Sequence, residues 1–230
     1  SDVEVTGSFT ANTYKLVYKV DGEVYKTTEV TYGTAPATEA APEKEGYTFS
    51  GWSEVPATMP ASDVEVTGSF TANTYKLVYK VDGEVYKTTE VTYGTAPATE
   101  AAPEKEGYTF SGWSEVPATM PASDVEVTGS FTANTYKLVY KVDGEVYKTI
   151  EVTYAKDITP EAAPEKEGHT FSGWSEIPAT MPAHDVEVTG SFTANTYKLV
   201  YKVDGEVYKQ IDVTYGTAIT PEEAPTKEGY

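Results

Sequence analysis

The sequence repeats itself every 61 residues. Residues 45–52 (EGYTFSGW) return as residues 106–113 and, with one substitution, as residues 167–174. Residues 1–61 and 62–122 are identical at every position, so the period divides the chain into three full repeats and 47 further residues. A fixed period of this length predicts a tandem array of one small supersecondary unit. The chain is therefore best understood one repeat at a time.

The composition narrows the possible functions. The formal net charge is −19, and all 17 basic residues are lysines. Arginine is the preferred bidentate partner of phosphate and guanine, so an acidic chain without arginine argues against nucleic-acid binding. Cysteine is absent, which leaves neither disulfides nor zinc thiolates to stabilise so small a unit. No apolar run approaches the roughly 20 residues of a membrane span, and the first residues are unlike a signal peptide. Because both ends cut through a repeat, we expect a fragment of a longer protein.

Alternation of polar and apolar residues predicts strands. Residues 2–10 alternate in this way and predict a half-buried strand. Residues 14–20 and 23–32 alternate on either side of Asp-Gly, which is the strongest short-range signal of a β-hairpin. Residues 47–49 predict a third strand of the repeat, and residues 63–70, which repeat the first strand, predict the closing strand.

The hairpin register follows from the side chains. A two-residue turn would scatter the apolar side chains over both faces of the hairpin. A three-residue loop at 21–23 pairs Val20 with Val24 and is the turn we predict. With this loop, one face of the hairpin is formed by Leu16, Tyr18, Val20, Val24, Val30 and Tyr32. Position 28 lies on this face and becomes Ile150 and Ile211 in later copies, whereas Lys26 must reach an edge of the sheet to remain solvated.

The segment between the hairpin and the third strand predicts little helix. Residues 33–46 contain two prolines, which allow at most one helical turn at 38–41. The string Thr-Pro-Glu at 159–161 and 220–222 favours a short helix or turn in the later copies.

Trp52 is predicted to anchor the core of the repeat. A buried tryptophan supplies a large apolar area, and its indole N–H needs one partner, which the polar loop 53–61 can provide. The alternative is an aromatic platform for a sugar or a peptide.

The sequence offers little that could perform catalysis or bind a metal. His169 and His184 replace Tyr47 and Ser62 of the first repeat, so neither belongs to a group present in every copy. Carboxylates at Glu43, Glu45 and Glu54 lie in loops without an apolar pocket that would raise one pKa, which leaves glycosidase chemistry unsupported.

The sequence also disfavours a calcium site and an isopeptide bond. The segment 21–23 (DGE) lacks the ligand spacing of a calcium loop. Lys26 is the candidate for an isopeptide bond, but the nearest asparagines are Asn12 and its equivalents in the connector. We therefore predict no catalytic, cofactor-binding or metal-binding residue and no cofactor, and no ligand-binding residue can be named.

Three motifs resemble a known family. They are the hairpin DGEVYK, the string from Pro42 to Trp52 (PEKEGYTFSGW), and Met59-Pro60-Ala61 leading into the closing strand. Together they look like the internalin-type B repeat, or Listeria–Bacteroides repeat, of bacterial cell-surface proteins. The resemblance covers essentially the whole chain. It implies a mainly β fold, with a small α+β fold possible, built as tandem β-grasp-like units of 61 residues in an extended array. In such a unit the first and last strands would be parallel and adjacent.

The resemblance also sets the limits of the repeats. Residues 1–12 would be the closing strand of a preceding repeat, and residues 196–230 a truncated repeat that is marginal alone. The full repeats would be 13–73, 74–134 and 135–195.

Three functions from different classes follow. The favoured one is a non-enzymatic extracellular array that serves as a semi-rigid stalk or spacer of a bacterial surface protein, attached to the cell wall through regions outside this sequence. The alternative is a multivalent adhesin module that binds a host protein or glycan. An enzyme is the least supported. Neighbouring repeats are the expected intramolecular partners, with neither nucleic acid nor membrane insertion.

Overall fold

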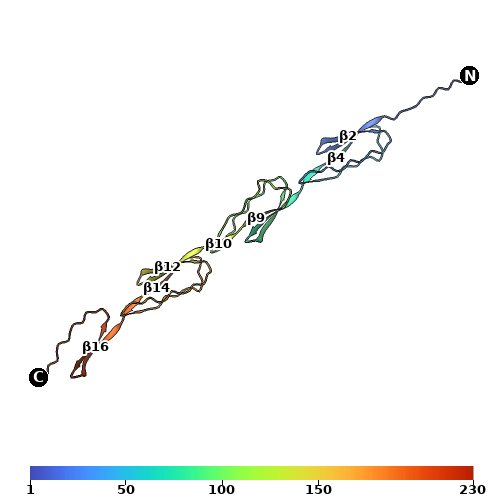
Figure 1. Cartoon of the computed structure of the whole chain (residues 1–230). Coiled ribbons are helices and arrows are strands. Elements are labelled where there is room, and N and C mark those ends of the chain that lie inside the picture. The colour runs from blue at the N-terminus through green and yellow to red at the C-terminus, as the bar shows by residue number, and fades with distance from the viewer. Residues whose placement is uncertain (230) are drawn as a thin grey trace. The chain divides into compact units, whose positions relative to one another are not determined.

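The computed structural model describes residues 1–229, and within them all regular secondary structure is β (Figure 1). No helix occurs in this range, and so none that could span a membrane. Each complete repeat contains five strands. In the first repeat they are β1 (Thr13–Val20), β2 (Glu23–Thr31), β3 (Tyr47–Phe49), β4 (Val64–Gly68) and β5 (Phe70–Ala72).

The same five strands recur in the next two repeats. The second has β6 (Thr74–Val81), β7 (Glu84–Thr92), β8 (Tyr108–Phe110), β9 (Val125–Gly129) and β10 (Phe131–Ala133). The third has β11 (Thr135–Val142), β12 (Glu145–Thr153), β13 (His169–Phe171), β14 (Val186–Gly190) and β15 (Phe192–Ala194). The last hairpin is formed by β16 (Thr196–Val203) and β17 (Glu206–Thr214).

The chain forms two compact units. The first consists of residues 1–102 and 111–130, and the second of residues 103–110 together with the described residues from Phe131 onward. The first repeat lies within the first unit, and the third repeat within the second.

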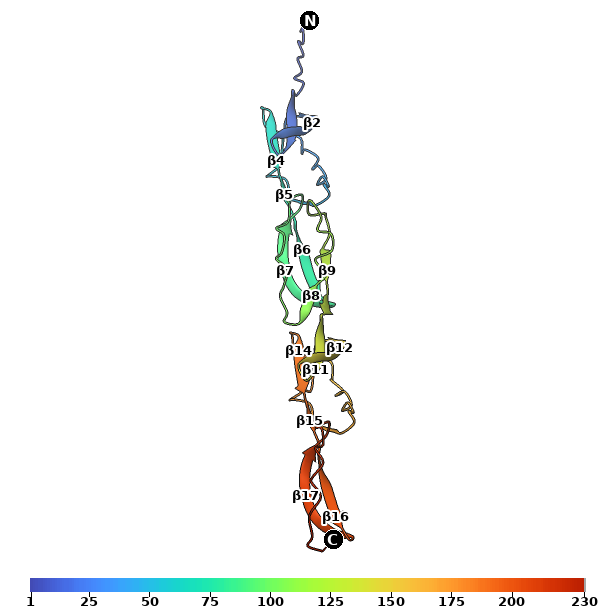
Figure 2. The ribbon, with the colours of Figure 1, turned by 90° about the vertical axis from the view of Figure 1, so that its left-hand side faces the viewer.

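Each complete repeat contains a three-stranded mixed sheet. In the first repeat its order is β2-β1-β4, with β1 antiparallel to β2 and parallel to β4. The equivalent strands β7, β6 and β9 lie side by side in Figure 2. The parallel pairing runs from Leu16 opposite Val64 to Val20 opposite Gly68. The expected adjacency of the first and last strands is therefore confirmed.

The predicted three-residue hairpin loop is wrong. Val20 lies opposite Glu23, so the turn consists of Asp21 and Gly22 alone. Both residues have positive φ, 51° and 87°, as a type I′ turn requires. The turn therefore follows the backbone preference of Asp-Gly rather than the side-chain pattern, and Val24, predicted to face inward, is 62% exposed.

A β-bulge then restores the predicted face. The register shifts between Tyr18 and Lys19, after which Leu16 lies opposite Thr28 and Tyr14 opposite Val30. One extra residue moves every later side chain to the other face of a strand. Position 28 thus faces the core as predicted, and in the third repeat Ile150 packs against the core there.

Four side chains form the buried core of each complete repeat. In the first repeat they are Leu16, Tyr18, Met59 and Val66, each at most 1% exposed, with Trp52 packed against them. The equivalents form the second and third cores, and the third adds Ile158 from its crossover. Full burial of a side chain of this size contributes about 1.5–3 kcal/mol.

The crossover between β2 and β3 is irregular throughout. Residues 38–41 form no helical turn, which is within the expected limit of one turn. Neither a helix nor a turn occurs at 159–161 or 220–222, so the expectation for the later copies is wrong. Tyr18 instead fixes the crossover from inside, because its hydroxyl donates to Ala37 O at 3.1 Å and accepts from Glu39 N at 3.3 Å. In the third copy an isolated bridge joins Asp157 to Thr180.

The predicted closing strand 63–70 is divided in two. β4 pairs with β1, the chain leaves this ladder at Ser69, and β5 pairs antiparallel with β3. The Phe49 ring lies against Gly68, at the end of β4, where a Cβ atom would collide with it. Because of this division, residues 64–72 contribute one strand to the three-stranded sheet and one strand to the pair with β3.

Residues 1–12 do not form the predicted half-buried strand. They have no regular structure, and Val3, Val5 and Phe9 are 87%, 91% and 108% exposed. Residues 1–11 have the same sequence as residues 62–72, which contain β4 and β5. The difference is the partner, because β4 pairs with a strand that begins about 50 residues earlier in the chain, and no residue of this sequence occupies that place for the first copy.

We predict that the buried methionine of each core is essential for stability, whereas Val24 and its equivalents are not. Replacing Met59, Met120 and Met181 together by Ala should cost about 2–5 kcal/mol of unfolding free energy per repeat, because each leaves a cavity. The matched control replaces the exposed Val24, Val85 and Val146 by Ala and should change it by less than about 0.5 kcal/mol. Urea unfolding followed by tryptophan fluorescence measures both, and comparable losses in the two variants would contradict this description of the core.

Candidate functional site

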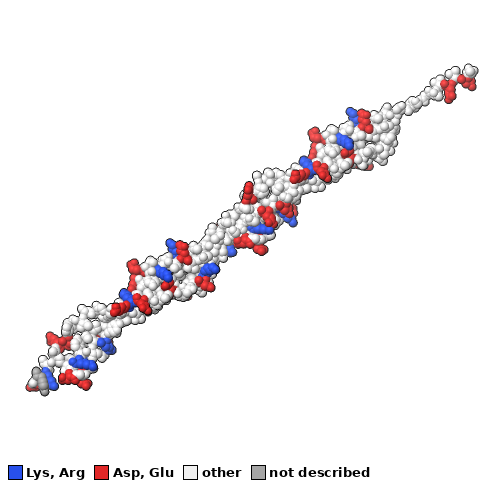
Figure 3. Space-filling model, in the orientation of Figure 1, with Lys and Arg blue, Asp and Glu red and all other residues white. Residues whose placement is uncertain are grey.

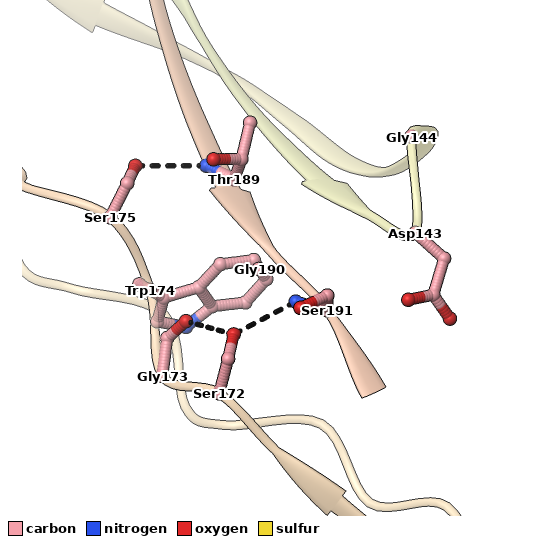
Figure 4. A pocket seen from close by; sticks show the side chains of 9 residues that line it. All are labelled: Asp143, Gly144, Ser172, Gly173, Trp174, Ser175, Thr189, Gly190 and Ser191. Atoms are coloured by element: carbon pink, nitrogen blue, oxygen red, sulfur yellow. Dashed lines mark hydrogen bonds between the residues drawn. The ribbon is translucent and has the colours of Figure 1, made fainter. Parts of the chain in front are cut away.

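A hollow of the same composition lies on each complete repeat. In the third repeat it has a volume of about 560 Å³ and is open to solvent. Figure 4 shows its lining: the turn residues Asp143 and Gly144, residues 172–175 after β13, and residues 189–191 at the end of β14. The first and second repeats have hollows of about 550 and 560 Å³ at the equivalent residues.

The hydroxyl groups in the hollow are engaged in holding the fold. Ser172 Oγ donates to Gly173 O at 2.9 Å and accepts from Ser191 N at 3.0 Å (Figure 4). Ser175 Oγ accepts from Thr189 N at 3.0 Å. Their geometry attaches the segment after β13 to the end of β14. The lining has one carboxylate, on Asp143, and lacks a second titratable group with which to form an acid–base pair.

Trp52 lies between the hollow and the core. Its ring makes edge contacts with Tyr18 and Phe49, at centroid distances of 4.8 and 4.9 Å, and a tilted contact with the half-exposed Tyr25 at 5.8 Å. The indole N–H donates to Ala40 O at 3.3 Å. The prediction that loop 53–61 accepts this hydrogen bond is wrong, since the acceptor lies in the crossover.

Lys26 reaches the edge of the sheet and forms an ion pair there. Its Nζ lies 2.5 Å from Glu39 Oε2, and the hydrogen bond and charge of Glu39 raise the pKa of the lysine. The pairs Lys87–Glu100, Lys148–Glu161 and Lys209–Glu222 repeat this geometry, and in each the glutamate hydrogen bond raises the lysine pKa. The partner of Lys26 is thus a carboxylate rather than the connector asparagine considered for an isopeptide bond.

The other singled-out residues lie apart from one another. His169 Nδ1 lies 2.8 Å from Glu167 O, and His184 Nδ1 lies 2.8 Å from Asp185 O. Within residues 1–229, no cluster of three or more His, Asp or Glu side chains could hold a metal ion. Glu43 and Glu45 line a second hollow of about 600 Å³ in the first repeat, next to Lys44, while Glu54 is exposed.

Consecutive repeats meet through a tyrosine and a glycine. Tyr93, which follows β7, places its ring against Gly46 and contacts the Tyr47 ring edge-on at 5.5 Å. A Cβ at Gly46 would come within 2.5 Å of the Tyr93 ring. Asn73 connects the two segments, since its N–H donates to Gly46 O at 2.9 Å and its carbonyl accepts from Tyr93 N at 2.8 Å.

The same contact occurs twice more. Tyr154 packs against Gly107 and Tyr108, and Tyr215 against Gly168 and His169, with ring distances of 5.5 and 5.6 Å. His169 thus serves at the junction in the place of a tyrosine. The role of these tyrosines was not predicted from the sequence, because their contact joins residues about 47 positions apart in different repeats. The signal was their constant place directly after the second strand of the hairpin.

Comparison with known proteins finds the same repeat in a described family and in bacterial relatives. A family model described as the Listeria-Bacteroides repeat domain matches residues 14–72, 75–133, 136–193 and 197–230. Internalin H of Listeria monocytogenes is 34% identical over 143 residues, covering 53% of this chain and 25% of that protein. A protein of Evansella cellulosilytica named as a Gly-rich membrane protein is 26% identical over 250 aligned residues, covering 95% of this chain and 29% of that protein.

The chain thus spans only between 25% and 29% of the length of these relatives. The family match, in contrast, covers most of the chain. The chain therefore belongs to the Listeria-Bacteroides repeat domain family, of which it carries four tandem copies.

Proposed function

We propose that this chain is a non-enzymatic spacer of a bacterial surface protein, in which the number of repeats sets the reach. The relatives include an internalin and a protein named as a membrane protein, which supports a location at the cell surface. Attachment to the cell wall would come from regions outside this sequence. We interpret each repeat as β-grasp-like, with the irregular crossover in the place of a helix.

The observation that carries this proposal is the junction between repeats. At the first junction a ring packs against a glycine, and Asn73 hydrogen-bonds to both neighbours. No flexible linker separates the repeats, because β5 ends at Ala72 and β6 begins at Thr74. A spacer needs such a junction, since freely jointed repeats would not hold a distal domain at a fixed distance.

The charge distribution suits an array that remains soluble. Lysines and carboxylates lie side by side on the face shown in Figure 3, and several form exposed ion pairs such as Lys19–Glu65. The net charge of −19 makes neighbouring chains repel each other. Exposed pairs contribute little to stability, so we assign these charges to solubility rather than to folding.

A multivalent adhesin is the alternative, and the recurring hollow favours it. The hollow has the same lining in all three complete repeats, with Trp52 and the half-exposed Tyr25 beside it in the first. A weak ligand, a host protein or a glycan, would then bind through several repeats at once. Neither the acidity nor the hydroxyl lining favours a nucleic acid.

The spacer proposal predicts that Tyr93 fixes the first junction. Spin labels at Glu54→Cys and Glu115→Cys, specific because the chain has no cysteine, should give a narrow distance distribution. Tyr93→Ala should broaden it, because the ring contact and its aromatic pairing of about 0.5–1.5 kcal/mol are lost. The control is Tyr32→Ala, the first-copy equivalent, which is 54% exposed and should leave the distribution unchanged. A broad distribution in the unsubstituted chain would refute a semi-rigid spacer.

The adhesin alternative predicts retention on a ligand panel. If the hollow binds, the full chain should be retained by a neutral glycan or a host-cell surface, and replacing Tyr25, Tyr86 and Tyr147 by Ala should reduce retention at least about tenfold through lost multivalency. Replacing the exposed Val24, Val85 and Val146 by Ala is the matched control. Background retention of the unsubstituted chain across the panel would leave the spacer as the supported function.

A further inference from the structure

We propose that each complete repeat is a mechanical clamp that resists tension applied along the chain. The proposal follows from the parallel pairing of β1 with β4, the strands on which the chain enters and leaves the central sheet. The use of such a clamp by a cell rests on the proposed spacer function. The mechanical property itself depends only on the fold of the repeat.

The direction of the strands determines how the repeat is loaded. Because β1 and β4 are parallel, the start of β1 and the end of β4 lie at opposite ends of their shared ladder. Tension on the chain therefore pulls the two strands past each other. All their backbone hydrogen bonds are strained at once, and none can open first at a free end.

The clamp continues beyond the ladder at both ends. Before the ladder, Lys15 N donates to Asp63 Oδ1 at 2.7 Å. After it, Asp21 N donates to Gly68 O at 3.0 Å, and Asp21 Oδ1 accepts from Phe70 N at 3.0 Å. All three bonds join the segment of β1 to the segment of β4, so they bear the same load as the ladder.

Side chains add a further connection between the two strands. Lys19 Nζ lies 2.5 Å from Glu65 Oε1, across the β1–β4 pair. On the opposite face, Leu16, Tyr18 and Val66 pack together in the core and keep water away from the ladder. Sliding one strand along the other would disrupt this packing in the same step.

The third repeat has the same clamp with the same partners. The distances are 2.8 Å for Lys137 N to Asp185 Oδ1, 3.0 Å for Asp143 N to Gly190 O, and 2.9 Å for Phe192 N to Asp143 Oδ1. In the second repeat the first of these bonds, from Lys76 N to Asp124 Oδ1, measures 2.8 Å. Three clamps therefore lie in series along one chain.

The last hairpin provides a contrast within the same molecule. β16 and β17 are antiparallel, so the chain enters and leaves this pair at the same end. Tension opens such a pair one residue at a time from that end. We therefore expect the hairpin to yield at low force and the three complete repeats to yield later.

The test is single-molecule force spectroscopy on the full chain. Handles on Thr13→Cys and Ser69→Cys load β1 against β4, whereas handles on Thr13→Cys and Thr31→Cys pull open the end of the β1–β2 hairpin. All three positions are exposed, and no native cysteine competes for the handles. We expect the first geometry to need a several-fold higher rupture force at equal loading rate, since rupture reports the unfolding barrier.

Pulling the chain from its ends supplies the second measurement. Three similar high-force events are expected, each releasing somewhat less than roughly 200 Å, the extended length of about 60 residues. Replacing Asp63, Asp124 and Asp185 by Ala should lower these forces, while replacing the exposed Glu54, Glu115 and Glu176 by Ala should leave them unchanged. Equal forces in the two handle geometries would overturn the clamp. A narrow distance distribution across the junction would still support the spacer, so the two proposals fail separately.

Discussion

The pairing of β1 with β4 is the interaction on which the rest of each repeat depends. Two parallel neighbours cannot be joined by a short turn, so the chain must travel from Asp21 to Asp63 before it can complete the sheet. That long connection supplies the hairpin strand, the crossover, and the side chains of Trp52 and Met59 that cover the face. A repeat of 61 residues without cysteine thus forms its core by packing the segment that connects β1 to β4 against the face of these two strands.

The two ends of the chain show what the same residues do without this pairing. Val66 in β4 is fully buried, whereas Val5, at the equivalent position of the first copy, is 91% exposed. Leu16 is 1% exposed, while Leu199 in the last hairpin is only partly buried. Identical local sequence therefore does not determine the burial. The partner strand does, as is usual for strands, whose preference depends on packing and pairing rather than on the backbone alone.

The sequence predicted the hairpin strands and the period of the repeats, but not the hairpin turn or the contacts between remote residues. The alternation of apolar residues located the two strands of the hairpin, although residues 2–10 alternate in the same way and form no strand, and the period located the repeats. The side-chain pattern predicted the wrong turn because a β-bulge shifts the register between Tyr18 and Lys19 and returns the side chains beyond it to the predicted face. Such a bulge cannot be recognised from the alternation alone. The hydrogen bonds from Tyr18 and Trp52 to the crossover could not be predicted for a different reason. Their acceptors, Ala37 O and Ala40 O, are backbone atoms, which any residue would supply.

The junction combines a backbone requirement with a spatial one at a single glycine. Gly46 has φ of 76°, a conformation that side chains disfavour, and its missing Cβ makes room for the Tyr93 ring. The neighbouring ring is less constrained, because His169 replaces tyrosine at the third junction and keeps an edge contact of 5.6 Å with Tyr215. An edge contact between two planar rings is retained when one aromatic residue replaces another. The glycine cannot be replaced in the same way, because the Tyr93 ring already fills the space that a Cβ atom would need. The register between consecutive repeats is accordingly set by the glycine and the tyrosine that covers it, with the adjacent ring adding area.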